Sequence, residues 1–432
     1  MSNFIKSILS EIKVKSKVKS KFFLHIILLN LSIWGRFNFL NMARFGVYSE
    51  KSYRNNFSKT FPFLDFNIAY IRRFEAIEMV IAGDASFIHK SGKCTYGKGI
   101  FWSGVHSSNL PGLEIHTLAV VDVENNQAYH LETIQTPETY YVSELIPKLE
   151  KTSPIKTNQV LKCNFDFLKS NSKNRVDFYI DHIIRNASQL LSISNYIVYD
   201  GFSYKRKFIN GIKLTGLYLV GKARSDSDLR YLYDDEDKKR DKDSGKLGRP
   251  KIYGEKINLK KPNFERFTEG YKDDDVKVYS LVVYSVLLKE NIKIAYTIYN
   301  KTKKYSVLFS TDLNLMGEKI YKYYRVRFSI EILFRDAKQY TGFEHSQARD
   351  ESKLNYHFNT SLTAVSLAKY QFYKDETNKM KPFSMRNIKL SNYNNLLTDF
   401  ILGNSDLNLS LEKRNQIYQK ISNFGQILSR AE

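Results

Sequence analysis

The chain has 432 residues, enough for two or three domains with buried cores. Apolar residues make up 42% of it and aromatic residues 14%, which excludes a disordered chain. Lys and Arg number 67 against 45 Asp and Glu, so the formal net charge is +22. This charge predicts attraction to a polyanion, with nucleic acid as the main candidate and an anionic membrane surface as the alternative.

Residues 1–75 are basic and mostly helical in pattern. The apolar run at 22–34 imitates a signal peptide or anchor, but it is too short to span a bilayer and has no cleavage site. We therefore expect a buried helix in a soluble, cytoplasmic, nucleoid-associated protein with no membrane contact. Residues 35–61 are typical of a helix, a turn at Gly46 and a second helix capped by Ser49. This is the outline of a helix-turn-helix, although other small helical bundles share it, and the second helix would carry Lys51, Tyr53, Arg54 and Asn55.

Two apolar segments contain an Asp beside a Gly. Within residues 79–88 the apolar run ends at Gly83-Asp84, and the run at 195–201 closes on Asp200-Gly201. Each predicts a buried strand with a carboxylate at its end. Further strands at 112–123, 127–136 and 216–226, with helices at 138–151 and 175–192, predict a mixed α/β layer. Residues 225–260 are dense in both charges and are expected to form a solvated excursion whose role we do not assign.

Residues 322–340 predict a helix with three distinct faces, at about 100° per residue. The first is apolar and should pack inward: Tyr323, Val326, Ile330, Leu333, Phe334 and Ala337. The second aligns one carboxylate with three cations and a phenol: Tyr324, Arg327, Glu331, Arg335 and Lys338. The third should be solvated: Lys322, Arg325, Ser329 and Asp336. Taken alone, the second face is explained as well by i,i+4 ion pairs on an exposed helix.

Asp84, Asp200 and Glu331 could meet if two adjacent strand ends face this helix. Mg²⁺ and Mn²⁺ prefer such hard oxygen ligands, and a pair of these ions can drive an in-line phosphoryl transfer without a side-chain base. The two cysteines and eight histidines show no metal-ligand spacing. Arg327 and Lys338 would then bind phosphate oxygens on either side of the glutamate.

Tyr324, Arg327, Glu331 and Lys338 match the signature Y-x2-R-x3-E-x6-K. On this signature the chain resembles a large group of bacterial insertion-sequence transposases of the DDE class, over most of residues 35–370. The resemblance implies a ribonuclease-H-like core with a β-rich insertion before the glutamate. It also implies that Asp84, Asp200 and Glu331 are catalytic and bind two divalent ions, Mg²⁺ with Mn²⁺ as a substitute. The remaining signature residues would bind the backbone of the transposon end, and a homodimer would bring two ends together.

Other basic residues are weaker candidates for DNA contact, each with a structural role as the alternative. They are Lys90 and Lys93 in a Gly-rich loop after the first acid, Arg335 on the helix, His345 and Arg349 beyond it, and Arg54. Asp122 follows an apolar strand but begins a good hairpin turn, so we interpret it as structural.

The expected fold class is α/β: a ribonuclease-H-like core with a β-rich insertion, a helical DNA-binding segment before it and a helical tail after it. The expected divisions are 1–75, 76–214, 215–312, 313–345 and 346–432. The expected function is metal-dependent cleavage of double-stranded DNA at transposon ends, followed by transfer of the 3′-hydroxyls into target DNA. The alternatives are a metal-dependent nuclease without strand transfer and a non-catalytic DNA-binding relative.

Overall fold

The computed structural model describes residues 2–12, 17–74, 78–91, 94–136, 174–233, 251–378, 381–405, 407 and 409–426. The helix expected at 138–151, Lys93 and part of the charged excursion lie outside these residues. In the described part of the chain, no helix is both long and apolar enough to cross a membrane.

The N-terminal region is a cluster of five helices. Their bounds are α1 (Ser2–Glu11), α2 (Lys17–Ser32), α3 (Phe39–Phe45), α4 (Glu50–Phe57) and α5 (Phe63–Ile71). Helix α2 contains the apolar run and is buried against later helices, as expected. Helix α3 ends at Gly46, and the Ser49 side chain caps α4 by accepting from the Ser52 amide. Tyr53 lies on α4 as expected, but its ring is fully buried and its hydroxyl pairs with His25 at 2.6 Å.

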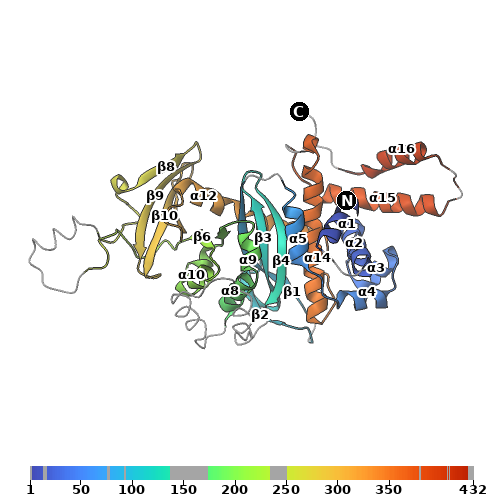
Figure 1. Cartoon of the computed structure of the whole chain (residues 1–432), viewed down its shortest axis with the longest axis horizontal. Coiled ribbons are helices and arrows are strands. Elements are labelled where there is room, and N and C mark those ends of the chain that lie inside the picture. Colours follow the sequence, from blue (N-terminus) through green and yellow to red (C-terminus); the bar gives the residue numbers. More distant parts are fainter. Residues whose placement is uncertain are drawn as a thin grey trace, which may run out of the picture.

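Within the described residues, one continuous sheet of eleven strands runs through the molecule (Figure 1). Its first half contains β1 (Met79–His89), β2 (Gly99–Ser103), β3 (Ser108–Asp122), β4 (Gln127–Thr136), β5 (Tyr196–Val198) and β6 (Tyr218–Lys222). The strands β1, β3 and β4 form an antiparallel meander, while β5 and β6 run parallel to β1. The spatial order β4-β3-β1-β5-β6 is consistent with a ribonuclease-H-like core.

The second half of the sheet contains β7 (Leu229–Arg230), β8 (Thr268–Lys272), β9 (Val276–Ser285), β10 (Glu290–Tyr299) and β11 (Tyr305–Ser310). Strand β11 pairs antiparallel with β6, so the expected insertion extends the core sheet and does not form a separate one. Strand β6 lies within the residues 215–312 expected for the insertion, yet it pairs with β5 of the core.

Helices cover both faces of the core sheet. The helices α8 (Arg175–Arg185), α9 (Ala187–Leu191) and α10 (Arg206–Lys213) follow the meander, and the short turn η2 (Gly201–Ser203) follows β5. His116 on β3 contacts His182 of α8. The next residue, Thr117, bonds Thr133, which is linked through His130 to Thr363 of α14 (Glu351–Tyr373). Since neighbouring residues of a strand point to opposite faces, α8 and α14 lie on opposite sides of the sheet.

Residues 317–340 form two helices and not the single one expected. They are α12 (Gly317–Val326) and α13 (Ser329–Tyr340), separated by Arg327 and Phe328. Both separating residues keep helical dihedral angles, and the amides of Ile330 and Glu331 bond to carbonyls three residues back. The chain therefore continues along nearly the same path through a tightened turn.

The apolar face of this segment packs inward as expected, and all six of its side chains are buried. The expectation of a solvated third face was wrong for two of its members. Ser329 is buried and donates to the Asn126 carbonyl, while Asp336 is buried next to Arg335 and near Lys369 of α14. Helix α14 (Glu351–Tyr373) therefore covers a second side of α13, which the sequence had predicted to be exposed to solvent.

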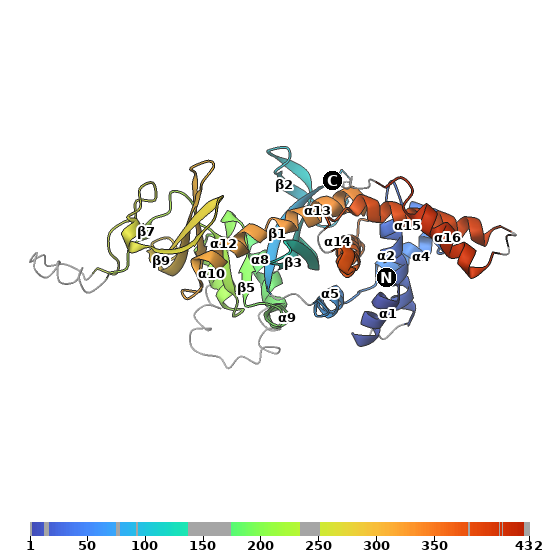
Figure 2. The same ribbon diagram turned by 90° about the horizontal axis from the view of Figure 1, so that it is seen from above.

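Helix α14 packs against both β4 and α2, so it joins the sheet to the N-terminal helices (Figure 1). The chain ends in α15 (Met385–Gly403) and α16 (Leu411–Ser422), which pack on each other and extend away from the sheet (Figure 2).

Gly83 and Tyr199 make a close contact between β1 and β5. A Cβ atom at Gly83 would lie 1.9 Å from the Tyr199 hydroxyl, and that ring is fully buried. We expect Gly83→Ala to lower the free energy of unfolding by about 1–3 kcal/mol, because the ring has no free space to enter. Denaturant titration would measure this loss. Gly104→Ala is the matched control, since nothing lies within 4 Å of its Cβ position, and equal losses in both would refute the steric explanation.

Candidate active site at the ends of the parallel strands

The two aspartates lie side by side because of the strand register. Strands β1 and β5 pair Ala82 with Val198, so Asp84 and Asp200, each two residues further on, are neighbours. Asp84 was expected at the end of its strand, but β1 continues to His89 while paired to β3. It is the parallel pairing with β5 that ends just before Asp84. Asp200 lies two residues after the end of β5 and accepts a bond from the Phe202 amide at 3.0 Å, which fixes its carboxylate at the start of η2.

Glu331 and Arg327 face Asp84 from the junction of α12 and α13. The Arg327 guanidinium lies 2.8 Å from the Glu331 carboxylate and 3.9 Å from that of Asp84. Its side chain is only 13% exposed, and its Nε atom has no hydrogen-bond partner among the described residues. Arg327 is therefore the counter-charge between two acids that come from distant parts of the chain.

The pKa of the Asp84 carboxyl is raised to about 7. Burial is the largest cause, Arg327 opposes it, and the charges of Asp200 and Glu331 raise the pKa further. Asp84 thus interacts electrostatically with both of the other acids expected from the sequence. In this arrangement, the described residues include no group of three acid, His or Cys side chains close enough to hold one metal ion.

The chemistry of the three acids suits a divalent cation. All are hard oxygen donors, and Asp84 is disfavoured as an anion by the charges of its neighbours. A cation between the carboxylates would relieve this repulsion, but Arg327 now occupies that role. The guanidinium would have to turn toward another anion, such as a phosphate, for the carboxylates to share an ion.

Tyr324 and Lys338 flank this centre. The Arg327 guanidinium lies over the Tyr324 ring at 5.9 Å, and the charge of Asp200 contributes to a raised tyrosine pKa whose main cause is burial. Lys338 donates to the Phe87 carbonyl at 3.2 Å, three residues beyond Asp84, and pairs with Glu344 at 3.1 Å. The four signature residues are therefore gathered at one edge of the sheet.

Two of the weaker candidates for DNA contact, Lys90 and His345, form tertiary contacts. Lys90 donates to the Ser346 carbonyl, and His345 accepts from the Phe37 amide at 3.1 Å. Both therefore tie the loop after α13 to other parts of the fold. Arg349 is exposed.

Two other arginines are on the surface. Arg335 is 59% exposed and pairs with Asp336. Arg54 forms an i,i+4 pair with Glu50 and lies over the Phe39 ring. Neither lies among the acids, so their DNA contacts stay predictions.

A buried polar chain behind the aspartates was missed by the sequence analysis. The Tyr199 hydroxyl bonds His116 at 2.8 Å, His116 bonds His182 at 2.7 Å, and His182 bonds Glu132 at 3.1 Å. These residues come from β5, β3, α8 and β4, so no local pattern links them. The chain holds Tyr199 against Gly83 and thereby fixes the separation of β1 and β5.

Phe328 was also missed. This ring is 56% exposed at the junction beside Arg327, where a large apolar side chain at the surface is available for contact with a ligand. Its signal in the sequence is only its place inside the signature.

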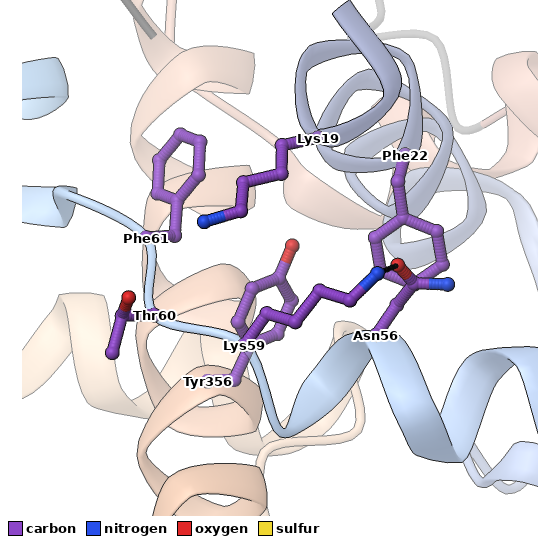
Figure 3. A pocket seen from close by; sticks show the side chains of 7 residues that line it. All are labelled: Lys19, Phe22, Asn56, Lys59, Thr60, Phe61 and Tyr356. Atoms are coloured by element: carbon purple, nitrogen blue, oxygen red, sulfur yellow. Dashed lines mark hydrogen bonds between the residues drawn. The ribbon is translucent and has the colours of Figure 1, made fainter. Parts of the chain in front are cut away.

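A separate pocket lies between α2, the end of α4 and α14, and Figure 3 shows its lining. The Tyr356 hydroxyl points between the side chains of Lys19 and Lys59, and Lys59 donates to Asn56 at 2.8 Å. The cavity is about 10 Å³, close to the minimum that one water requires. It is too small to be a substrate site.

Residues 256–380 match a family model described as archaeal putative transposase ISC1217, a family of DDE transposases. The match includes all four signature residues and the strands β8 to β11, but neither Asp84 nor Asp200. It supports a transposase-type protein of the DDE class. None of the curated proteins matches the chain.

The raised pKa of Asp84 predicts a pH-dependent stability. The folded protein keeps the Asp84 proton up to a pH of about 7, whereas the unfolded chain releases it near the ordinary value of 3.8. Stability therefore falls as pH rises between these values. The carboxylate is 21% exposed, so we expect a loss of about 2 kcal/mol.

The variant Asp84→Asn cannot ionise. In EDTA it should melt at a higher temperature than the parent protein at a pH of about 8, and at a similar temperature at a pH of about 4. Thermal melting followed by circular dichroism would measure the difference. A parent protein that melts higher than the variant at both pH values would contradict the burial of an unfavourable charge at this position.

Proposed function

We propose that this protein is a DNA transposase that cuts double-stranded DNA at transposon ends and joins the ends to target DNA. The observation that carries the proposal is that Arg327 lies between Glu331 and Asp84, and that the charges of both Asp200 and Glu331 act on Asp84. The match of residues 256–380 to a transposase family supports it from the side of sequence.

In this proposal Asp84, Asp200 and Glu331 bind two divalent cations, Mg²⁺ or Mn²⁺. Such ions supply activation of the attacking oxygen and charge stabilisation of the leaving one when bound. Arg327 leaves the carboxylates and donates to a phosphate oxygen through its planar fork. Lys338 binds a phosphate on the other side of Glu331, and the Tyr324 hydroxyl donates to a third.

The reaction has two steps. In the first, a water oxygen attacks the phosphorus at the transposon end, and the bond to the 3′ oxygen breaks. The 3′ oxygen leaves with the electron pair of the bond and takes up a proton. In the second, this 3′-hydroxyl attacks a phosphodiester of the target, so one ester bond replaces another. No external source of energy is needed.

A dimer is part of the proposal because two ends must be held together. The hairpin of α15 and α16 exposes a set of large apolar side chains that a second copy would cover: Leu397, Phe400, Ile401, Leu407, Leu411, Ile421 and Phe424.

Substitution of the acids tests catalysis. Asp84→Asn, Asp200→Asn and Glu331→Gln should each abolish cleavage of an end-bearing duplex, because the metal ligands are lost. DNA binding should stay within about threefold, because the basic side chains that contact phosphates remain. Glu318→Gln is the control, since this acid of α12 pairs with Lys322. Full cleavage by any of the three variants would refute the assignment.

The products separate a transposase from a nuclease. Incubation of the end duplex with a supercoiled target should yield joined molecules, whereas a nuclease yields cut ends alone. The melting temperature of the parent protein should also rise with Mg²⁺ or Mn²⁺ at a pH of about 8, and that of Asp84→Asn should not. A parent protein insensitive to both ions would contradict the metal proposal.

The phosphate contacts have their own test. Arg327→Ala and Lys338→Ala should each weaken duplex binding about tenfold and lower the slope of log K against log salt by about 0.9, the value for one lost phosphate contact. Lys260→Ala, an exposed lysine of the insertion, is the control for the change in net charge. Fluorescence anisotropy at several salt concentrations would measure the slopes, and slopes equal to the control would count against the phosphate role.

A further inference from the structure

A groove of about 350 Å³ lies beside Asp200, on the side away from Arg327 and Lys338. Its lining is Gly201, Lys222, Ala223, Arg224, Ser225, Tyr305, Ser306 and Val307. The pocket of Figure 3 has a volume of only about 10 Å³, so the groove is the larger of the two spaces. A volume above about 300 Å³ is in the range of ligand sites.

The strand register places this groove in line with the acids. Strands β5 and β6 pair Val198 with Val220, so Asp200 and Lys222, each two residues further on, are neighbours. The pairing of β1 with β5 makes Asp84 the neighbour of Asp200 in the same way. Because these strands are parallel and lie about 4.8 Å apart, Asp84, Asp200 and Lys222 form a row along one edge of the sheet. Ligands of α/β sheets bind at this carboxyl edge.

The groove has the chemistry of a phosphate site. Lys222 and Arg224 are exposed at its rim, and in the described part of the chain Lys222 forms no ion pair. Arg224 is paired bidentately with Asp226 at 2.9 Å, but both side chains are about two-thirds exposed, so a phosphate can displace that weak pair. Ser225 adds a hydroxyl, and buried Ala223 and Val307 form an apolar floor.

We infer that this groove binds a phosphodiester, with its nucleotide, of a DNA strand next to the bond that is cut. The inference rests on the proposed function. Cations then lie on both sides of the two aspartates: Arg327 and Lys338 beside Asp84, and Lys222 and Arg224 beside Asp200. A polyanion laid along the edge would be held on both sides of the reacting phosphate, which restricts its position.

The test is the double variant Lys222→Ala/Arg224→Ala. Its matched control is Lys260→Ala/Lys261→Ala, which removes the same charge from two exposed lysines of the insertion. Binding of an end duplex in EDTA should weaken about 30-fold in the groove variant, and its salt slope should fall by about 1.8. The control should stay within about threefold. A groove variant that matches the control in binding, slope and target joining would overturn the inference.

A second experiment replaces single phosphates of the DNA with neutral methylphosphonates. End duplexes that carry one methylphosphonate at a time should include a position at which neutralisation weakens binding to the parent protein but not to the groove variant. If end binding is unchanged and only joining to a target plasmid falls, the groove holds the target strand, and methylphosphonates in a short target duplex should show the same coupling. Absence of a coupled position in both duplexes would refute the groove.

The proposed function can fail separately. Suppose that the parent protein cuts no DNA but that its binding to a duplex still depends on Lys222 and Arg224. That result would overturn the transposase function and support phosphate binding in the groove. Conversely, suppose that the parent protein cuts and joins DNA and that the groove variant matches the control in binding, salt slope and joining. That result would support the transposase function and overturn the groove inference.

Discussion

The site depends on the placement of like charges close together. Burial, together with the charges of Asp200 and Glu331, disfavours the Asp84 carboxylate and raises its pKa to about 7. One cation, Arg327, reaches both Asp84 and Glu331. Such an arrangement costs stability unless it is compensated, and charged groups at functional sites are commonly of this kind. The acids stay together despite this loss of stability because two strands and a helix junction are fixed around them.

What fixes them is packing on the other face of the sheet. Gly83 allows the Tyr199 ring to cross β1 with no side chain between, and the chain of His116, His182 and Glu132 holds the tyrosine hydroxyl. The residues that bring the two aspartates together thus precede each of them by one position and point the opposite way. The acids and their support are parts of the same two strands.

The sequence predicted the parts of the site that repeat along one element. The inward face of 323–337 was confirmed because its apolar spacing is local, and Gly46 and Ser49 ended and capped helices as their chemistry requires. The errors came from contacts between distant segments. Asp336 was assigned to solvent, but α14 covers it, and the contact that buries Tyr53 against His25 joins residues 28 positions apart. The polar chain behind the aspartates spans four elements, so no spacing in the sequence could show it. The approach of Asp84 to Asp200 depends on which strands pair, and apolar runs alone do not specify a partner.

The continuity of the sheet from β1 to β9 has a mechanical meaning. A separate lobe attached by flexible connections could swing, and anything attached to it would shift against the acids. Here strand β11 is hydrogen-bonded along β6, so the strands of the insertion continue the core sheet without a break. Under the proposed function, a duplex that contacts β9 or β10 would be positioned relative to Asp84 and Asp200 through this shared sheet.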